Sequence, residues 1–411
     1  MTLKEDGKII LQEALAAALP DAAVNKALES IRFSDGKLVM IAVGKAAWQM
    51  AFAAHETPGV RIDAGVVITK YGYAKGAIGD FSICEAGHPV PDENTFEATE
   101  KVIQAVSNLT ERDSVLFLLS GGGSALFEKP LIQKEELYAL TDKLLASGAD
   151  ITEMNTVRKR LSAVKGGRFA QICAPAHVYS IILSDIIGDP LDMIASGPAY
   201  PDASSSEQAL AILRKYDIPV SGETRACLMR ETPKRLDNVT TIVTGSVRQL
   251  CLTAEAACRR LGYEPVVLTA SLSCTARDAG SFLGSIAQFH AEDTRSIAFI
   301  AGGETVVRLT GKGKGGRNQE IALAAAEKIA GIRNCAVFSF GSDGTDGPTD
   351  AAGGWCDGDT SRILSQQGID IDDVLMRNDS YHALERCGGL IMTGPTGTNV
   401  NDLSVVLIKR G

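Results

Sequence analysis

The most chemically suggestive part of the chain is residues 341–350, with the sequence GSDGTDGPTD. Its carboxylates, Asp343, Asp346 and Asp350, lie three and four residues apart between glycines, which disfavour a helix. Residues 337–340 just before them are apolar enough for a buried strand, so the loop is predicted to leave a strand end, where open α/β sheets bind ligands. Carboxylate oxygens suit divalent cations. We therefore predict that Asp343 and Asp346 bind a metal ion.

A basic glycine loop lies upstream of this acidic loop. Residues 311–317 read GKGKGGR, with Lys312, Lys314 and Arg317 as cations, and they lead into an Ala-rich helix. Glycine loops and helix N-termini attract anions. We predict that Lys312 and Lys314 bind phosphate or another anionic group, and that the two loops together handle a phosphate ester with a divalent ion.

Two strand ends in the N-terminal half carry further candidates. Lys45 follows the apolar residues 38–43, where a cation can meet a phosphoryl group, although a solvated lysine is the alternative. Residues 120–124 read SGGGS after the apolar residues 115–119, and three successive glycines exceed what a tight turn requires. Backbone N–H groups and both serine hydroxyls are predicted to bind an anion there. These residues are Ser120, Gly121, Gly122, Gly123 and Ser124.

Residues 154–168 form a cation-rich segment, predicted as a short helix that ends at a Gly-Gly pair. Cations near a helix C-terminus commonly lie on the surface and complement the helix dipole, so we select only Asn155 and Arg158 as substrate-binding candidates.

Asp185 and Asp189 follow another apolar run. Asp185 is the candidate base and Asp189 a candidate metal ligand, with a simple Asp-Pro turn as the alternative for Asp189.

Short apolar runs alternate with longer amphipathic stretches along the chain, which predicts an α/β fold with a largely parallel sheet. Strands are predicted over residues 38–43, 64–68, 115–119, 178–183, 241–244, 265–268, 296–301, 336–340 and 403–408, and helices over residues 97–109, 134–147, 206–216, 250–261, 276–289 and 319–329. The length of 411 residues favours two domains, and prolines and charges place the division near residue 235. We expect domains 1–235 and 236–411, with the last strand free to return to either sheet.

The composition limits the kind of partner. Hydrophobic residues make up 45% and charged residues 22%, as in globular proteins, and the net charge of −9 disfavours a nucleic-acid or membrane-surface partner. The nine cysteines form no C-x-x-C pair and are expected to be reduced thiols. The N-terminus lacks the apolar run of a signal peptide, and no segment is apolar enough to span a bilayer. We therefore expect a cytoplasmic protein that acts on small molecules.

Two nucleotide-binding signatures are missing. Lys45, Lys312 and Lys314 are each followed by alanine or glycine, so the chain has no P-loop. No clean G-x-G-x-x-G opens a first βα unit with an acidic residue about twenty positions on, so a dinucleotide site lacks its usual support.

Taken together, these motifs resemble those of the type-2 glycerate kinases, the family that carries the so-called MOFRL C-terminal domain. The resemblance covers nearly the whole chain in order, through residues 44–45, 87–92, 120–124, 155–162, 184–189, 195–198, 302–305, 315–320 and 343–350. It implies ATP- and Mg²⁺-dependent phosphorylation of D-glycerate at the 2-hydroxyl. It also implies a Rossmann-like N-terminal domain, a smaller C-terminal α/β domain and an active site in the cleft between them. Ser342 stands where the family has threonine, which keeps the hydroxyl.

The resemblance also suggests roles for residues. The family's essential lysine and arginine fall on Lys45 and Arg317, which we assign to the transferring phosphoryl group and the substrate carboxylate. Asp185 or Asp189 would accept the hydroxyl proton or hold Mg²⁺, and Asp343 and Asp346 would hold metal or nucleotide. From the residues alone, His88 is expected to be a turn residue, with a catalytic role as the alternative.

Two other functions remain as alternatives at this point. The first is a hydroxypyruvate reductase that uses NAD(P)H, and the second is a binding protein for sugar acids or nucleotides. A monomer or a homodimer is equally compatible with the sequence.

Overall fold

The computed structural model describes residues 2–184 and 191–410, which form two compact units. The first unit contains the described residues from Ala23 to Thr244. The second contains the N-terminal helix α1 (Leu3–Ala18) and the chain from Gly245 onward.

The first unit is built on a six-stranded sheet in which all neighbouring strands are parallel, in the order β3-β2-β1-β4-β5-β6. Its strands are β1 (Leu38–Val43), β2 (Ala64–Lys70), β3 (Ser82–Ala86), β4 (Ser114–Leu119), β5 (His177–Leu183) and β6 (Val239–Thr244). This is the order of dinucleotide-binding folds, and it reverses direction between β1 and β4. Such a switch point is where ligands bind in open α/β sheets.

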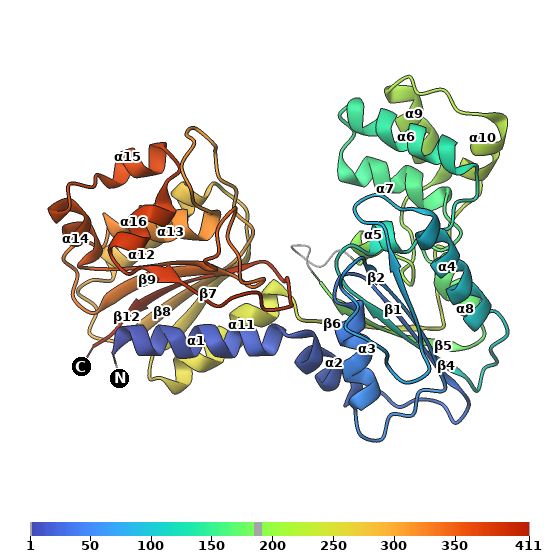
Figure 1. The fold of residues 1–411 in the computed structure, drawn as a ribbon, viewed down its shortest axis with the longest axis horizontal. Coiled ribbons are helices and arrows are strands. Elements are labelled where there is room, and N and C mark those ends of the chain that lie inside the picture. Colours follow the sequence, from blue (N-terminus) through green and yellow to red (C-terminus); the bar gives the residue numbers. More distant parts are fainter. Residues whose placement is uncertain (1, 185–190, 411) are drawn as a thin grey trace. The chain divides into compact units, whose positions relative to one another are not determined.

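Helices cover this sheet and form a separate cluster beyond it (Figure 1). The helices of the unit are α2 (Pro20–Leu28), α3 (Ala47–Glu56), α4 (Glu93–Val106), α5 (Gly123–Leu126), α6 (Lys134–Ala146), α7 (Ile151–Arg160), α8 (Arg168–Cys173), η1 (Ile194–Ser196), α9 (Ser206–Lys215) and α10 (Gly222–Leu228). Helices α6, α7, α9 and α10 share one core that includes Leu140, Val157 and Leu213. Capping boxes at Asp150 and Ser205 begin α7 and α9.

The second unit has a mixed six-stranded sheet in the order β11-β10-β9-β12-β8-β7. Its strands are β7 (Glu264–Leu272), β8 (Ile297–Gly303), β9 (Cys335–Gly341), β10 (Gly353–Asp357), β11 (Leu390–Ile391) and β12 (Asp402–Ile408). Only β7 and β8 pair in parallel, whereas β12 runs antiparallel to both β8 and β9. The last strand therefore lies inside the second sheet.

Helices cover both faces of the second sheet (Figure 1). Helices α1 and α11 (Val247–Arg260) lie on one face, and α12 (Ala276–Phe289), α13 (Arg317–Ala326), α14 (Thr360–Gln366), α15 (Ile371–Met376) and α16 (Ser380–Arg386) lie on the other. The core on that second face includes Leu283, Leu323 and Val406.

The α/β class and the Rossmann-like first sheet are confirmed, with differences in detail. The sequence places the domain division near residue 235, but β6 belongs to the first sheet and α1 packs on α11 of the second unit. Strands β3, β10 and β11 were not predicted. β3 is a half-buried edge strand, β10 begins with two glycines and β11 has two residues, so none gives a strong apolar run. Within the described ranges, no helix is both long and apolar enough to cross a membrane.

Candidate active site

The switch point of the first sheet is occupied by two turns that are hydrogen-bonded to each other. The Lys45 N–H donates to the Gly121 carbonyl at 2.9 Å, and the Ala46 N–H donates to Ser120 Oγ at 3.0 Å. Gly44 has a φ of +124°, and a Cβ there would lie 2.2 Å from Ser120 Oγ. Only glycine permits this approach, so the turn after β1 and the turn after β4 form one rigid structure.

The side chains around this structure are electropositive. A Cβ on Gly122 would lie 3.0 Å from the His88 ring and 3.3 Å from Lys45 Cγ, so both side chains flank the glycine turn. Burial, and then the charges of Lys45 and Lys70, lower the pKa of His88. The turn thus carries lysine charge beside a neutral imidazole, a setting that favours an anion.

Ser120 has a structural role that differs from the predicted one. Its side chain is 2% exposed, and its hydroxyl accepts the Ala46 N–H. We therefore assign Ser120 to positioning the Lys45 turn, whereas anion binding by the Ser120 hydroxyl stays a prediction that this contact does not support.

Ser124 joins the glycine turn to helix α7. Its hydroxyl lies 3.1 Å from that of Ser196, which donates to Asn155 Oδ1 at 3.0 Å. The Ser124 carbonyl accepts from Lys165 Nζ at 2.8 Å and from Arg158 Nη2 at 3.4 Å. The predicted residues Ser124, Asn155 and Arg158 are thus brought together.

The segment that carries Ser196 has an unusual backbone. Ala195, Ser196 and Gly197 all have positive φ, at 49°, 62° and 62°. Non-glycine residues adopt this conformation at a cost, and such residues gather at functional sites. The Gly166 N–H donates to the Ser196 carbonyl at 3.0 Å, which ties the segment to Gly166.

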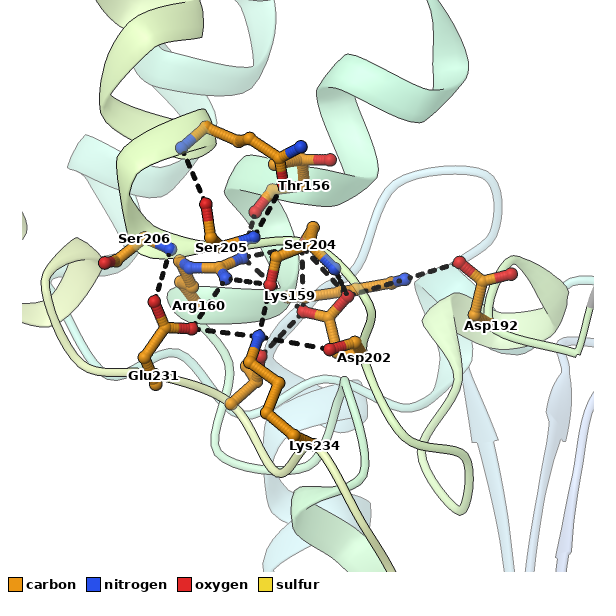
Figure 2. A network of polar contacts seen from close by, with 12 residues as sticks. Thr156, Lys159, Arg160, Asp192, Asp202, Ser204, Ser205, Ser206, Glu231 and Lys234 are labelled. Atoms are coloured by element: carbon orange, nitrogen blue, oxygen red, sulfur yellow. Dashed lines mark hydrogen bonds and ion pairs between the residues drawn. The ribbon is translucent and has the colours of Figure 1, made fainter.

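Two cations of α7 belong to a buried network rather than to a solvated helix end (Figure 2). Lys159 Nζ lies 3.2 Å from Asp192 and 3.4 Å from Asp202, and Arg160 lies 3.4 Å from Asp202 and 3.2 Å from Glu231. Both cations are at most 2% exposed. The expectation that cations near this helix end complement the dipole at the surface is therefore wrong for Lys159 and Arg160, because long-range carboxylates pair with them.

In the second unit, Arg317 lies where three strand ends meet. The strand register places Asp402, the first residue of β12, opposite Gly303 at the end of β8 and Gly341 at the end of β9. Arg317 begins α13 and donates to Asp402 through Nε at 2.5 Å and through Nη2 at 3.0 Å. Its Nη1 donates to Glu304 at 3.0 Å. This arrangement fixes the plane of the guanidinium group.

Asp346 caps helix α13. Its carboxylate accepts the N–H groups of Asn318 at 3.1 Å and Gln319 at 2.8 Å. Burial raises the pKa of Asp346 to about 7, and these two hydrogen bonds oppose the rise. Both carboxylate oxygens are used by the helix, so the structure does not support Asp346 as a metal ligand. It also fills the helix N-terminus that the sequence assigns to an external anion.

The basic glycine loop likewise uses backbone groups internally. The N–H groups of Gly311 and Lys314 donate to Asn378 and Asp379 side chains at 2.8 and 3.0 Å, and the Gly313 N–H donates to the Arg377 carbonyl at 2.8 Å. These three N–H groups are therefore not available to an anion, which leaves the lysine side chains as candidates. They are those of Lys312, which is exposed, and Lys314.

The other two carboxylates of the acidic loop, those of Asp343 and Asp350, make separate contacts. Asp343 is half-buried, and one of its oxygens accepts the Thr345 N–H at 3.0 Å. Asp350 accepts the Tyr381 hydroxyl at 2.8 Å. Among the described residues, no group of three or more His, Cys, Asp or Glu side chains is arranged to hold a metal ion. Asp185 and Asp189 lie outside the described residues.

Comparisons with known proteins match the chain along its whole length. A family model described as a domain of unknown function matches residues 6–229, and the MOFRL family model matches residues 297–402. The chain is 50% identical to the D-glycerate 2-kinase of Thermotoga maritima, over 99% of both chains. It is 41% identical to the glycerate 2-kinase of Pyrococcus horikoshii, over 100% of this chain and 99% of the other.

The chain belongs to the glycerate 2-kinase family. A crystal structure of the Thermotoga maritima glycerate kinase superposes with a TM-score of 0.94, at 50% identity and 99% coverage of each chain. Two relatives from Agrobacterium vitis, each 39% identical, carry a provisional hydroxypyruvate reductase name. The family resemblance stated from the sequence motifs is confirmed.

Within this glycerate 2-kinase family member, the structure adds residues that sequence reasoning gave no role. Ser196 joins Ser124 to Asn155, and Asp402 and Glu304 orient Arg317. Buried Lys165, whose pKa is lowered to about 8 by burial, supports the Ser124 carbonyl. The motifs containing Ser196 and Glu304 were visible in the sequence, whereas Asp402 had no local signal because it only begins a strand.

Proposed function

We propose that this chain transfers the γ-phosphoryl group of ATP to the 2-hydroxyl of D-glycerate and releases 2-phosphoglycerate and ADP. Relatives with glycerate 2-kinase names match it from end to end. The structural observation that supports it best is the Lys45 turn, hydrogen-bonded to a glycine turn at the switch point of a parallel sheet. Phosphoryl transfer depends on positioning and charge neutralisation, which is what such a turn supplies.

In the first unit, we assign Lys45 to the transferring phosphoryl group. The backbone of Gly121, Gly122 and Gly123 shapes the turn against which the phosphoryl oxygens lie. Arg158 reaches the Ser124 carbonyl through Nη2 at 3.4 Å, and we assign its other N–H groups to the glycerate carboxylate, with Asn155 beside it. The bidentate fork of arginine suits a carboxylate.

In the second unit, we assign Arg317, Lys312 and Lys314 to the charges of the nucleotide phosphates and the substrate. Arg317 is held in place by Asp402 on one edge of the guanidinium group, and Glu304 is the exchangeable partner because its side chain is 47% exposed. Lys314 Nζ lies 3.9 Å from the centre of the Tyr381 ring. This cation–π contact helps to position the lysine side chain.

The transfer step requires a base for the glycerate hydroxyl. We assign this role to Asp185 from its position in the sequence. The 2-hydroxyl oxygen forms a bond to the γ-phosphorus while the bond from that phosphorus to the ADP oxygen breaks, and the hydroxyl proton passes to the Asp185 carboxylate.

A magnesium ion fits part of the acidic loop. Mg²⁺ is usually held in proteins by one or two carboxylates together with substrate phosphates, so a cluster of three is not required. Asp343 fits because it is half-buried and only its Oδ1 accepts the Thr345 N–H, whereas both oxygens of Asp346 accept helix N–H groups. We propose Asp343 and Asp189 as the protein ligands. When bound, the ion neutralises charge on the β- and γ-phosphates.

The reductase alternative has two observations in its favour, namely the strand order of dinucleotide-binding folds and the provisional names of two relatives. Against it, the turn after β1 reads Gly44-Lys45-Ala46 and lacks the glycine fingerprint that lets a pyrophosphate approach a helix N-terminus. We therefore place the kinase first.

The deciding experiment incubates the purified chain with ATP, Mg²⁺ and D-glycerate and couples it to enolase, which uses 2-phosphoglycerate directly. An enolase signal that requires all three components supports the proposal. Release of ADP without that signal would point to the 3-hydroxyl or to another acceptor. Absence of ADP release together with NADH oxidation by hydroxypyruvate would replace the kinase with the reductase.

The same assay tests the metal ligand. Asp343→Asn should raise the Mg²⁺ concentration needed for half-maximal rate about tenfold or more, since one carboxylate ligand is lost. Asp350→Asn is the matched control, because Asp350 is exposed and pairs with Tyr381. An unchanged Mg²⁺ requirement in Asp343→Asn would remove Asp343 from the metal site.

A further inference from the structure

A cavity of about 610 Å³ lies in the second unit, and none of the residues assigned to phosphoryl transfer lines it. One wall is helix α1 with its C-cap residue Leu19, and the helix contributes Lys4, Gly7, Lys8, Leu11 and Leu15. The opposite wall comes from the β9–β10–β11 end of the sheet, including Phe338, Trp355 and Leu390. The volume lies within the range of about 300–1,000 Å³ that small-molecule sites occupy.

Helix α1 gives the cavity two different ends. A Cβ on Gly7 would lie 2.4 Å from Trp355 Cζ3, so the start of the helix rests directly on the indole ring. Lys4 and Lys8, three residues before and one residue after Gly7, lie at this same end. Leu15 lies further along the helix, about 12 Å from Gly7 at 1.5 Å per residue, and Leu19 follows at the helix C-cap. The cavity is therefore elongated, with lysines at one end and leucines at the other.

The charged side chains that line the cavity have a single sign. Its lining includes Lys4 and Lys8 but no aspartate or glutamate, in a chain whose net charge is −9. Lys4 Nζ donates to the Gly388 carbonyl at 3.0 Å, which holds that cation at the rim. Leu15 and Leu19 are only half-buried, and Met392 is 57% exposed. An apolar interior thus opens beside a positive rim.

The indole N–H of Trp355 supplies an independent observation. Trp355 is 8% exposed and stacks on Phe338 with ring centres 5.3 Å apart. Its buried Nε1 has no hydrogen-bond partner among the described residues. Buried donors are nearly always paired in folded proteins, so this unpaired indole N–H is an exception in the wall of the cavity.

We propose that this cavity is a binding site for a small amphipathic carboxylate, with its carboxylate at the Lys4 and Lys8 rim and its apolar chain along Leu11, Leu15 and Leu19. The apolar chain covers leucine and methionine surface that is otherwise exposed to water.

Octanoate and 1-octanol are a matched pair of probes, since they share a chain length and differ in charge. Isothermal titration of the full-length chain with octanoate should give saturable binding to one site per chain, at least tenfold tighter than the binding of 1-octanol. Octanol binding equal to or tighter than that of octanoate would overturn the carboxylate assignment.

Two variants locate the site. Lys8→Gln should weaken octanoate binding at least fivefold, and Lys26→Gln, an exposed lysine on α2, should leave it unchanged. Leu15→Trp should abolish binding by filling the cavity, while far-UV circular dichroism and the melting temperature show that the fold is kept. Octanoate affinity that is unchanged in both Lys8→Gln and Leu15→Trp, or an absence of saturable binding to the unmodified chain, would overturn the proposal.

Discussion

Arg317 holds Asp402 in a two-bond fork, with Nε and Nη2 donating to the two carboxylate oxygens at 2.5 and 3.0 Å. Asp402 is buried, so the fork compensates a carboxylate that is removed from water. Burial would lower the pKa of Arg317, but the hydrogen bonds and charge of Asp402 outweigh it and raise that pKa. Arg317 therefore stays charged, and its orientation is decided by Asp402.

Replacing Arg317 by lysine tests the fork itself. Arg317→Lys keeps the charge but cannot make two parallel bonds, so we expect kcat to fall about 10²–10³-fold, the usual cost of losing an aligned donor in a transition state. The measurement is the steady-state rate with saturating ATP and D-glycerate. Arg362→Lys, an exposed arginine on α14, is the control. Near-normal turnover in Arg317→Lys would show that charge alone is required.

Lys45 is tested by removing its charge. Lys45→Ala should lower kcat about 10²–10³-fold while leaving the turn intact, because the contact that fixes the turn comes from the Lys45 backbone N–H and not from its side chain. Lys26→Ala provides the comparison for loss of an exposed lysine. Full turnover in Lys45→Ala would show that the Lys45 side chain takes no part in catalysis.

Ser120 separates positioning from direct catalysis. Ser120→Ala removes the acceptor of the Ala46 N–H and leaves that donor without this partner, so unfolding free energy should fall by about 1–3 kcal/mol. The kcat of Ser120→Ala should also fall, because the Lys45 turn loses the contact that positions it. Ser120→Thr keeps a hydroxyl and should recover part of the rate. Equal losses in Ser120→Ala and Ser120→Thr would argue against a hydroxyl role, and a stable but inactive Ser120→Ala would indicate contact with substrate.

Asp346 gives the second unit a pH-dependent stability. Its pKa is about 7 in the folded chain against an ordinary value of 3.8, because burial disfavours the charged form. Between these two values the folded state binds a proton that the unfolded state has lost, so stability falls as pH rises from about 4 to about 7 and is flat above that. Between pH 5 and pH 8 this amounts to about 2–3 kcal/mol.

The variant Asp346→Asn should remove this dependence, since an amide cannot ionise. Hydrogen exchange of the α13 amides, corrected for intrinsic rates, reports the opening free energy of this region at pH 5 and pH 8. The unmodified chain should lose stability over that interval relative to Asp346→Asn, whereas Asp350→Asn should follow the unmodified chain because the pKa of Asp350 is lowered by the Tyr381 hydrogen bond. Parallel behaviour of the unmodified chain and Asp346→Asn would contradict the raised pKa.

Elements with a clear local pattern could be read from the sequence with good accuracy. The apolar run at residues 38–43 and the amphipathic stretch at residues 276–289 match β1 and α12 at both ends. Strand β10 could not be read because its first residues are Gly353 and Gly354, which lack side chains to form an apolar pattern. Position 353 requires glycine, because a Cβ there would lie 1.9 Å from the Ser339 carbonyl oxygen.

The sequence by itself determined the α/β class, the turns that carry Lys45 and the triple glycine, and the family to which the chain belongs, because these depend on local residue patterns. Only the tertiary structure decided how individual polar groups are used. Asp346 looks like a metal ligand in the sequence, yet it caps α13, and Ser120 looks like an anion ligand, yet it holds the Lys45 turn. A buried polar group must find a partner, and which residue supplies that partner is set by packing between segments far apart in the chain.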